Sequence, residues 1–300
     1  MDILTLNNVR KSFGEKEIIR DISFTVPEHC IYGFIGQNGA GKTTTMKMIL
    51  GLMKYDGGEI TVCGNKVNFG QNKTNQYIGY LPDVPEFYNF MTPKEYLLLC
   101  GDITGISKDV ALNRADELLE MVGIADANKR IKGFSRGMKQ RLGIAQALFN
   151  KPRLLICDEP TSALDPMGRK EILDILMKAK KETTVIFSTH ILSDVERICD
   201  KVAFLHHGEI VLQGDLDEIK AGNRGTAVEI DFKDSREANI FAKKYPNAEK
   251  CNSLRLQYEK QTDKDMLDMM KYMSDNKICP ERIERLEANL EDLFMEVVGK

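Results

Sequence analysis

Residues 36–44 have the sequence GQNGAGKTT, which matches the pattern G-x-x-x-x-G-K-[ST]. In this pattern, small residues let successive backbone N–H groups close around phosphate oxygens at the start of a helix. The apolar run Ile31–Ile35 predicts a buried strand before the loop, and residues 43–52 carry apolar side chains at helical spacing after it. This order of strand, loop and helix favours a phosphate-binding loop. The alternative is a glycine-rich turn that caps an ordinary helix.

The loop supplies a set of candidate nucleotide-binding residues. Lys42 offers a positive charge to the phosphates and is a candidate catalytic residue. Thr43 offers a hydroxyl group to Mg²⁺. The full set is Gly36, Gln37, Asn38, Gly39, Ala40, Gly41, Lys42, Thr43 and Thr44.

The length and the charge of the chain limit the classes of protein it can belong to. Its 300 residues are many for one compact unit, and a prior of about 150 residues per domain suggests two domains. The formal net charge is -3, and charged residues of both signs, 29% of the chain, are interspersed. This balance argues against a dedicated nucleic-acid binder, so we expect no nucleic-acid partner.

The cysteines and the apolar runs indicate a cytosolic protein. The seven cysteines form no C-x-x-C pair, which is typical of reduced thiols. The amino terminus, MDILTLNNVRKSF, lacks the apolar core of a signal peptide, and no apolar run approaches the roughly 18 residues of a membrane span. We therefore expect a cytoplasmic chain whose association with a membrane depends on a partner.

Residues 1–220 are predicted to form an α/β domain. Short alternating strands are expected up to about residue 75, and the helical pattern at about 92–148 indicates an insertion of helices. Two buried strands are expected at 154–157 and 184–188, with a helix at 168–181 between them. A strand, a helix and a strand in this order are typical of a parallel sheet.

A second, smaller α/β domain is predicted at 225–300, after a polar, glycine-bearing linker at 221–225. Its strands are expected at 227–232, 254–258 and 282–286, and its helices at 237–244, 264–274 and 290–298. Its sequence contains no catalytic constellation that we can find. One hypothesis for this domain is therefore that it binds a regulatory ligand.

An acidic pair follows the strand expected at 154–157. Asp158 ends this apolar run, which places its carboxylate at the carboxyl edge of the sheet, beside the phosphate-binding loop. An acid in this place can hold the hydration shell of Mg²⁺. Glu159 is suited to polarise a water molecule that attacks the γ-phosphate. The alternative is that the acidic pair only caps a helix.

The segment 134–148, FSRGMKQRLGIAQAL, carries a resemblance to a known family. It resembles the signature loop and helix of the ATP-binding cassette (ABC) family, and the resemblance covers about residues 2–220. The resemblance implies a P-loop NTPase core with an antiparallel β subdomain and a helical subdomain. It also implies that Ser135 and the Gly137 amide contact ATP bound by a second monomer. A homodimer, or a pseudo-dimer, would then enclose two ATP molecules.

The resemblance suggests roles for further residues. Phe13 resembles the aromatic side chain that stacks on adenine, with a core phenylalanine as the alternative. Residues 162–165, SALD, resemble the D-loop that crosses the dimer interface. His190, in FSTH, resembles the switch histidine that contacts the γ-phosphate, and we group it with Glu159 and Lys42 as candidate catalytic residues.

The chain departs from the family pattern in two places. The signature Leu-Ser-Gly-Gly-Gln is altered at three of five positions, although Ser135 and Gly137 are retained. Asp83 stands where the family usually has glutamine. We hypothesise that Asp83 faces Mg²⁺ and couples subunit movement to hydrolysis, because a carboxylate can meet this ion. The candidate metal-binding residues are therefore Thr43, Asp83 and Asp158.

Residues 83–90, DVPEFYNF, follow in the region that receives a short helix of the membrane subunit in the resembling family. Phe87, Tyr88 and Phe90 are candidate anchors for that subunit. The alternative is that these aromatic side chains pack locally against the inserted helices.

The resemblance as a whole implies an ATPase that uses ATP and Mg²⁺ to power export through a separate membrane permease. It is most like bacterial export systems of the multidrug and peptide-antibiotic type, which places the chain peripherally on the cytoplasmic face of the membrane. The alternative is a soluble ABC ATPase that acts as a mechanical switch on the ribosome or on DNA. One phosphate-binding loop, no long heptad run and no strongly basic stretch favour the transporter.

Overall fold

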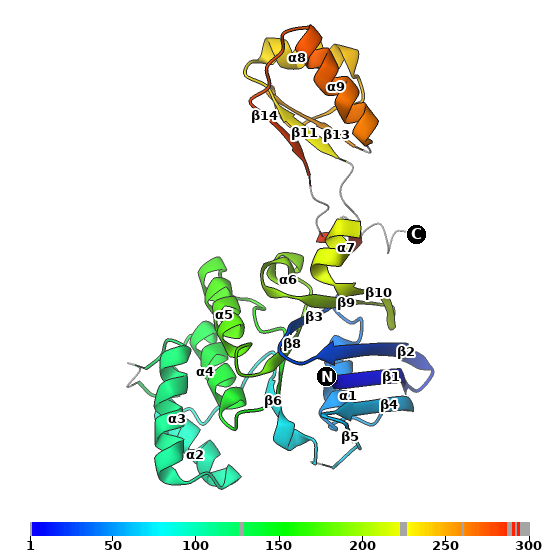
Figure 1. Cartoon of the computed structure of the whole chain (residues 1–300). Helices are drawn as coiled ribbons and strands as arrows, with labels where there is room; N and C mark the ends of the chain where they lie inside the picture. The colour runs from blue at the N-terminus through cyan, green and yellow to red at the C-terminus, as the bar shows by residue number, and fades with distance from the viewer. Residues whose placement is uncertain are drawn as a thin grey trace. The chain divides into compact units, whose positions relative to one another are not determined.

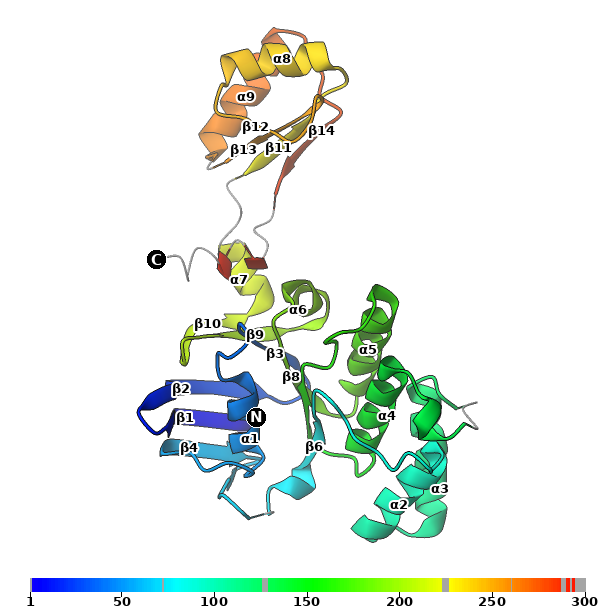
Figure 2. The same ribbon diagram turned by 180° about the vertical axis from the view of Figure 1, so that it is seen from behind.

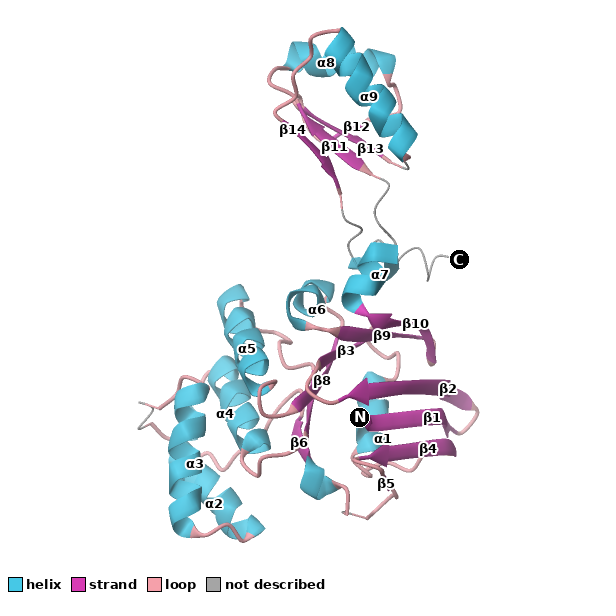
Figure 3. Ribbon diagram, in the orientation of Figure 1, coloured by secondary structure: helices cyan, strands magenta, loops and turns pink. Residues whose placement is uncertain are grey.

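The computed structural model describes residues 2–71, 73–125, 129–222, 227–259, 261–286, 290–291 and 293–294. The chain forms two compact units, one that extends to Leu216 and one that begins at Asp217 (Figure 1). Helices and strands are mixed in both units, which confirms the predicted α/β class (Figure 3). Most of the linker expected at 221–225 and of the helix expected at 290–298 lies outside the described residues.

A six-stranded sheet forms the centre of the first unit. Its strand order is β10-β9-β3-β8-β7-β6, and neighbouring strands pair in parallel except in the β9–β10 hairpin. Every residue of β3 (Ile31–Ile35), β7 (Leu154–Asp158) and β8 (Thr184–Thr189) is buried, as expected of parallel strands that are covered on both faces. The other strands are β6 (Ile78–Leu81), β9 (Lys201–His206) and β10 (Glu209–Asp215).

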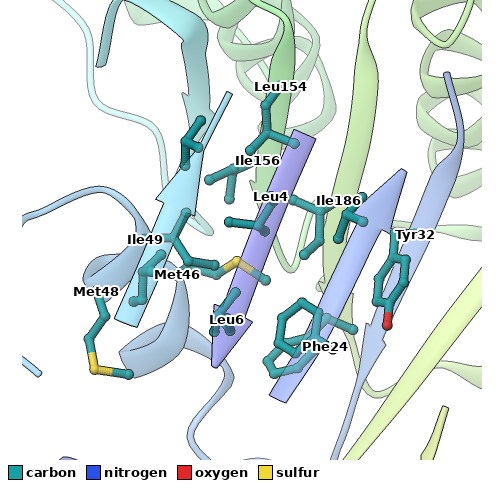
Figure 4. Packing of buried hydrophobic residues seen from close by; sticks show 14 of the residues in the cluster. Leu4, Leu6, Phe24, Tyr32, Met46, Met48, Ile49, Leu154, Ile156 and Ile186 are labelled. Carbon is teal, nitrogen blue, oxygen red and sulfur yellow. The ribbon is translucent and has the colours of Figure 1, made fainter. Parts of the chain in front are cut away.

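Helix α1 (Lys42–Ile49) contacts this central sheet and also a second, antiparallel sheet. The second sheet has the order β2-β1-β4-β5, with strands β1 (Asp2–Phe13), β2 (Lys16–Pro27), β4 (Gly57–Val62) and β5 (Asn65–Lys66). Leu4 and Phe24 of this sheet, Met46 of α1 and Ile156 of the central sheet belong to one buried cluster (Figure 4). The cluster thus holds α1 against both sheets.

Helices α2 (Pro93–Thr104), α3 (Lys108–Met121) and α4 (Arg136–Leu148) lie within the segment 92–148 that was predicted to be helical (Figure 2). A capping box begins α2: Thr92 accepts the N–H of Glu95, and the Glu95 side chain accepts the N–H of Thr92. Helix α4 packs so closely on β6 that a Cβ atom on Gly79 would lie 2.1 Å from the carbonyl oxygen of Ala147. The position of α4 against the sheet is therefore narrowly defined.

Two more helices follow the strands that carry the candidate catalytic residues. Helix α5 (Pro166–Ala179) begins two residues before the expected 168, because Asp165 accepts the N–H of Gly168 as an N-cap and Pro166 is well suited to the first turn. Helix α6 (Leu192–Ile198) follows β8, and the short helix α7 (Leu216–Gly222) follows β10.

In the described part of the second unit, helices α8 (Ser235–Lys244) and α9 (Asp263–Asp275) accompany a small antiparallel sheet. Its sheet has the order β12-β13-β11-β14, formed by β11 (Val228–Asp231), β12 (Glu249–Lys250), β13 (Arg255–Tyr258) and β14 (Arg282–Arg285). Helices α8 and α9 share one buried cluster with alternate residues of these strands, such as Ile230 and Leu256. Both helices therefore cover the same face of the sheet.

Candidate active site

The carboxyl ends of β3, β7 and β8 meet at one edge of the central sheet. The phosphate-binding loop follows β3, the acidic pair stands at the end of β7, and His190 follows β8. A pocket of about 440 Å³ opens at this edge. It is lined by Phe13, Ile18, Asn38, Gly39, Gly41, Lys42, Thr43, Thr44, Asp83, Glu159, Ser162 and His190. Most of the residues selected from the sequence thus surround one cavity.

The phosphate-binding loop needs glycine at two of its positions for steric reasons. A Cβ atom on Gly36 would lie 2.5 Å from the carbonyl oxygen of Leu205, and one on Gly41 would lie 2.5 Å from the Ile19 side chain. Gly41 also has a φ of +112°, which a residue with a side chain rarely adopts. Lys42 opens α1 and is only 6% exposed, and its Nζ donates to the carbonyl oxygens of Gly36 (2.6 Å) and Gln37 (3.2 Å).

Glu159 lies between Lys42 and His190. Its Oε1 is 3.0 Å from Lys42 Nζ, and its Oε2 is 3.0 Å from His190 Nδ1. The pair with Lys42 lacks the angle of a hydrogen bond, so Oε1 has no hydrogen-bond donor among the described residues. Glu159 also adopts a φ of +49°, in the left-handed region that non-glycine residues seldom occupy. Its carboxylate therefore lies in front of the phosphate-binding loop, with one oxygen able to accept a further hydrogen bond.

Asp158 lies behind Glu159 and is only 2% exposed. The hydroxyl group of Ser188 on β8 donates to Asp158 Oδ1 at 2.5 Å. The same hydroxyl oxygen accepts the N–H of Glu159 at 3.1 Å. Sequence analysis missed Ser188, although its place in an apolar strand two positions before His190 could have indicated it.

Two ionisable neighbours of the acidic pair remain uncharged near neutral pH. Burial, together with the charge of Asp158, raises the pKa of Tyr80 to about 12. Burial also raises the pKa of the Cys157 thiol far above its usual range. The predicted buried strand therefore holds an inert thiol, and neither group can act as a proton acceptor at neutral pH.

Phe13 projects from the end of β1 at the rim of the pocket. It is 50% exposed, so it is not the core phenylalanine that was the alternative. Lys11 Nζ lies 5.2 Å from the centre of its ring. The exposed ring beside the phosphate-binding loop offers a surface on which a base can stack.

Among the predicted site residues, Gly36, Gln37, Ala40 and Asp158 adjoin this pocket in the chain without lining it, and Ser135 and Gly137 lie on another element and do not line it either. Both stand at the start of α4, where the Ser135 hydroxyl accepts the N–H of Met138 and caps the helix. The helix amino terminus has a positive dipole and free N–H groups, which suit the binding of an anion. Within one chain these residues are not brought to the phosphate-binding loop.

Asp83 lines the pocket but also has a partner on α4. Its Oδ1 accepts a hydrogen bond from Arg136 at 3.1 Å, and its backbone oxygen accepts one from Gln140 at 2.6 Å. The Asp83–Arg136 ion pair is partly exposed, and pairs of this kind contribute little to stability. The contacts nevertheless join the loop after β6 to the segment that resembles the family signature.

A polar network connects the segments that follow Glu159 and His190. The buried hydroxyl of Thr161 donates to Asp194 Oδ2 at 2.7 Å. Arg169 of α5 donates to Asp194 Oδ1 at 2.6 Å, and Asp194 itself is buried on α6. The network thus joins Thr161 and Arg169, which stand on either side of the segment 162–165, to α6, the helix that follows His190.

Comparisons with known proteins agree with this geometry. Residues 19–162 match the family model described as ABC transporter. The chain is 42% identical over 247 residues to YxlF of Bacillus subtilis (strain 168), an ABC transporter ATP-binding protein, covering 82% of each chain. It is 36% identical over 307 residues to BcrA of Bacillus licheniformis, a bacitracin transport ATP-binding protein, covering 99% of this chain and 97% of BcrA.

A solved structure described as the ATP binding subunit of an ABC transporter aligns with a TM-score of 0.65 at 32% identity. The alignment covers 73% of this chain and 92% of that one.

The fold and the site define a P-loop ATPase that binds ATP. This chain belongs to the ABC transporter family, as an ATP-binding subunit of the kind that hydrolyses ATP to power transport. The relatives thus support a transporter subunit over a switch that acts on ribosomes or DNA.

Across the described ranges, no helix has the length and apolar character that crossing a membrane requires. The same residues contain no group of three or more His, Cys, Asp or Glu side chains that could hold a metal ion.

We predict that Asp194→Ala lowers the free energy of unfolding by about 1–3 kcal/mol, because the buried Thr161 hydroxyl and Arg169 lose their shared acceptor. The matched control is Asp174→Ala, which removes a partly exposed ion pair with Arg197 and should cost less than about 1 kcal/mol. Urea unfolding of the two variants measures the difference. Equal losses would show that the hydrogen bonds to Asp194 stabilise the fold no more than an exposed ion pair does.

Proposed function

We propose that two copies of the chain bind two ATP molecules and close around them to drive export by a separate membrane permease. The observation that carries this proposal is the convergence of Lys42, Glu159 and His190 on one pocket that the phosphate-binding loop also lines. The nucleotide-binding residues would be those of the loop together with Phe13. The bacitracin transport relative supports a peptide-antibiotic or multidrug substrate class.

The donors beside the pocket fit Mg²⁺. Thr43 lines the pocket, and Asp158 stands at the end of β7, so a hydroxyl and a carboxylate near the pocket carry the oxygen ligands that this ion prefers. In this proposal Thr43 and Asp158 hold Mg²⁺, directly or through its water shell, with Asp83 as a further ligand. Bound Mg²⁺ would supply positive charge that neutralises phosphate oxygens.

Lys42, Glu159 and His190 would carry the chemistry. Lys42 is bound to two loop carbonyls and to Glu159, and in the proposed cycle it exchanges these partners for phosphate oxygens. Glu159 is thereby released from its cation, and its Oε1 is placed to accept a proton from an attacking water. His190 keeps its contact with Oε2 and donates toward the γ-phosphate as charge develops there.

Ser135 and Gly137 would complete the site of the other subunit. Both stand at a helix amino terminus outside the pocket of their own chain, which supports a contact with phosphate bound by the other copy. The nucleotide would then be enclosed between the loop of one copy and α4 of the other. Closure on ATP and opening after hydrolysis would move the attached permease.

The permease would dock at residues 83–90, on the cytoplasmic face of the membrane. Tyr88 and Phe90 are 57% and 65% exposed, and their rings lie 5.9 Å apart. Phe87 instead packs edge-on against Tyr96, so of the three predicted aromatic residues it is the least available as an anchor. The loop also carries Asp83, which lines the pocket. Contact with the permease would therefore act on the pocket through Asp83.

The domain boundaries remain part of the proposal. Residues 1–220 would form the ATPase domain, and residues 225–300 an accessory domain with the regulatory role considered above. The described part of the second unit has its own buried cluster around Phe241 and Leu256, which supports an independent domain.

We predict that Glu159→Gln binds ATP but hydrolyses it at least about 100-fold more slowly, because the amide cannot accept the proton of water. It should accumulate as a nucleotide-bound dimer, measured by size-exclusion chromatography with ATP and Mg²⁺. Glu120→Gln, an exposed substitution on α3, is the matched control and should behave as wild type. Near-normal turnover of Glu159→Gln would contradict the role given to Glu159.

We predict that Asp83→Ala raises the Mg²⁺ concentration for half-maximal ATPase activity about 10-fold, since a ligand of the ion is lost. Arg136→Ala is the control, because it removes the Asp83–Arg136 pair but leaves the carboxylate in place. Titration of both variants with Mg²⁺ separates the two effects. If both curves match that of the wild type, or if both shift alike, Asp83 is not a ligand of Mg²⁺.

We predict that the double substitution Tyr88→Ala with Phe90→Ala abolishes co-purification with the co-expressed permease while ATPase activity of the isolated chain is kept. Each exposed ring is expected to act as an anchor worth about 2 kcal/mol or more of binding. Phe69→Ala, which removes another exposed ring, is the control. Unchanged co-purification of the double variant would place the permease contact elsewhere.

A further inference from the structure

Ser188 occupies the point where the two strands that carry the acidic pair and His190 touch. It is fully buried on β8, and in the parallel pairing of β7 with β8 it stands directly opposite Asp158. Side chains at paired positions of neighbouring strands lie on the same face of the sheet, close enough to interact. The register of the sheet therefore places the Ser188 hydroxyl against the Asp158 carboxylate.

The hydroxyl group uses its hydrogen-bonding capacity on both members of the acidic pair. Its single proton is donated to Asp158 Oδ1 at 2.5 Å, the short distance typical of a hydroxyl bound to a carboxylate. Its oxygen accepts the N–H of Glu159 at 3.1 Å. A hydroxyl group has one donor, so this donor fixes which oxygen of Asp158 faces β8. The other oxygen of Asp158, Oδ2, therefore points away from Ser188.

Glu159 needs such a restraint because its backbone is in a disfavoured conformation. A φ of +49° in a residue with a long side chain persists only where the surroundings hold it. The N–H of Glu159 is held by the hydroxyl group and by the carbonyl oxygen of Ser188, both at 3.1 Å. This backbone conformation directs the Glu159 carboxylate to Lys42 and His190.

We propose that Ser188 is a positioning residue for ATP hydrolysis. Its hydroxyl group orients Asp158 for the metal ion and holds Glu159 in the backbone conformation that aims its carboxylate at the pocket. The inference rests on the proposed roles of Asp158 and Glu159. Ser188 itself does not line the pocket, so it acts through these two residues.

The test compares Ser188→Ala, Ser188→Cys and Ser188→Thr with Thr184→Ala. Thr184 is a buried residue at the other end of β8, where its hydroxyl accepts the N–H of His29. We expect Ser188→Ala to lower kcat about 10–100-fold and to raise the Mg²⁺ concentration for half-maximal activity. Its affinity for ATP measured without Mg²⁺ should stay within about twofold of the wild type, because Ser188 orients only the acidic pair and leaves the phosphate-binding loop intact.

The replacements at Ser188 should rank by their ability to donate. Ser188→Thr keeps the hydroxyl and should restore most of the activity, whereas Ser188→Cys, with a weak donor in a similar volume, should lie between threonine and alanine. Thr184→Ala should keep the kcat and the Mg²⁺ requirement of the wild type.

The proposal is overturned if Ser188→Ala keeps wild-type kcat and Mg²⁺ requirement. It is also overturned if Ser188→Ala and Thr184→Ala lose activity equally, in proportion to a fall in their unfolding midpoints. Asp158→Asn and Glu159→Gln are measured beside them. If those two variants lose turnover and Ser188→Ala does not, the inference about Ser188 fails alone; if Glu159→Gln retains turnover, the proposed function fails.

Discussion

The parallel pairing of β3, β7 and β8 is the constraint on which the site depends. The three strands are completely buried, and their carboxyl ends meet at one edge of the sheet. Each end delivers one chemical part: the phosphate-binding loop, the acidic pair, or His190. A slip of one residue in either pairing would turn the side chains to the opposite face and separate these parts. The apolar character of the strands is therefore a condition of the chemistry as well as of the fold.

The charges at this edge are arranged around Glu159. Its carboxylate contacts Lys42 on one side and His190 on the other. Lys42 is meanwhile bound to loop carbonyls in the place where phosphates are expected. In the proposed cycle, binding of ATP exchanges the partners of Lys42, and this exchange releases Glu159. Lys42 contacts both the loop carbonyls and Glu159, so in the proposal the binding of nucleotide at Lys42 also frees Glu159 to act on water.

Local sequence patterns were sufficient to predict much of the molecule. The strand and the helix that flank the phosphate-binding loop, the buried strands and the helices within 92–148 depend on neighbouring residues, and the structure confirms these elements. The bond between Ser188 and Asp158 and the pair of Asp83 with Arg136 could not be predicted in this way, because each joins residues far apart in the sequence. They depend on strand register and on the packing of α4 against β6. The position of Phe87 against Tyr96 likewise depends on how α2 packs.

A structure of the wild-type chain with Mg²⁺ and a non-hydrolysable ATP analogue tests the central claim most directly. We predict two copies that enclose two nucleotides, with Lys42 bound to phosphate oxygens and no longer to the carbonyls of Gly36 and Gln37. Ser135 of the partner subunit should contact the γ-phosphate, and Glu159 should keep its positive φ. A nucleotide bound by a single copy with Lys42 still paired to Glu159, or a dimer in which Ser135 lies away from the phosphates, would contradict the claim.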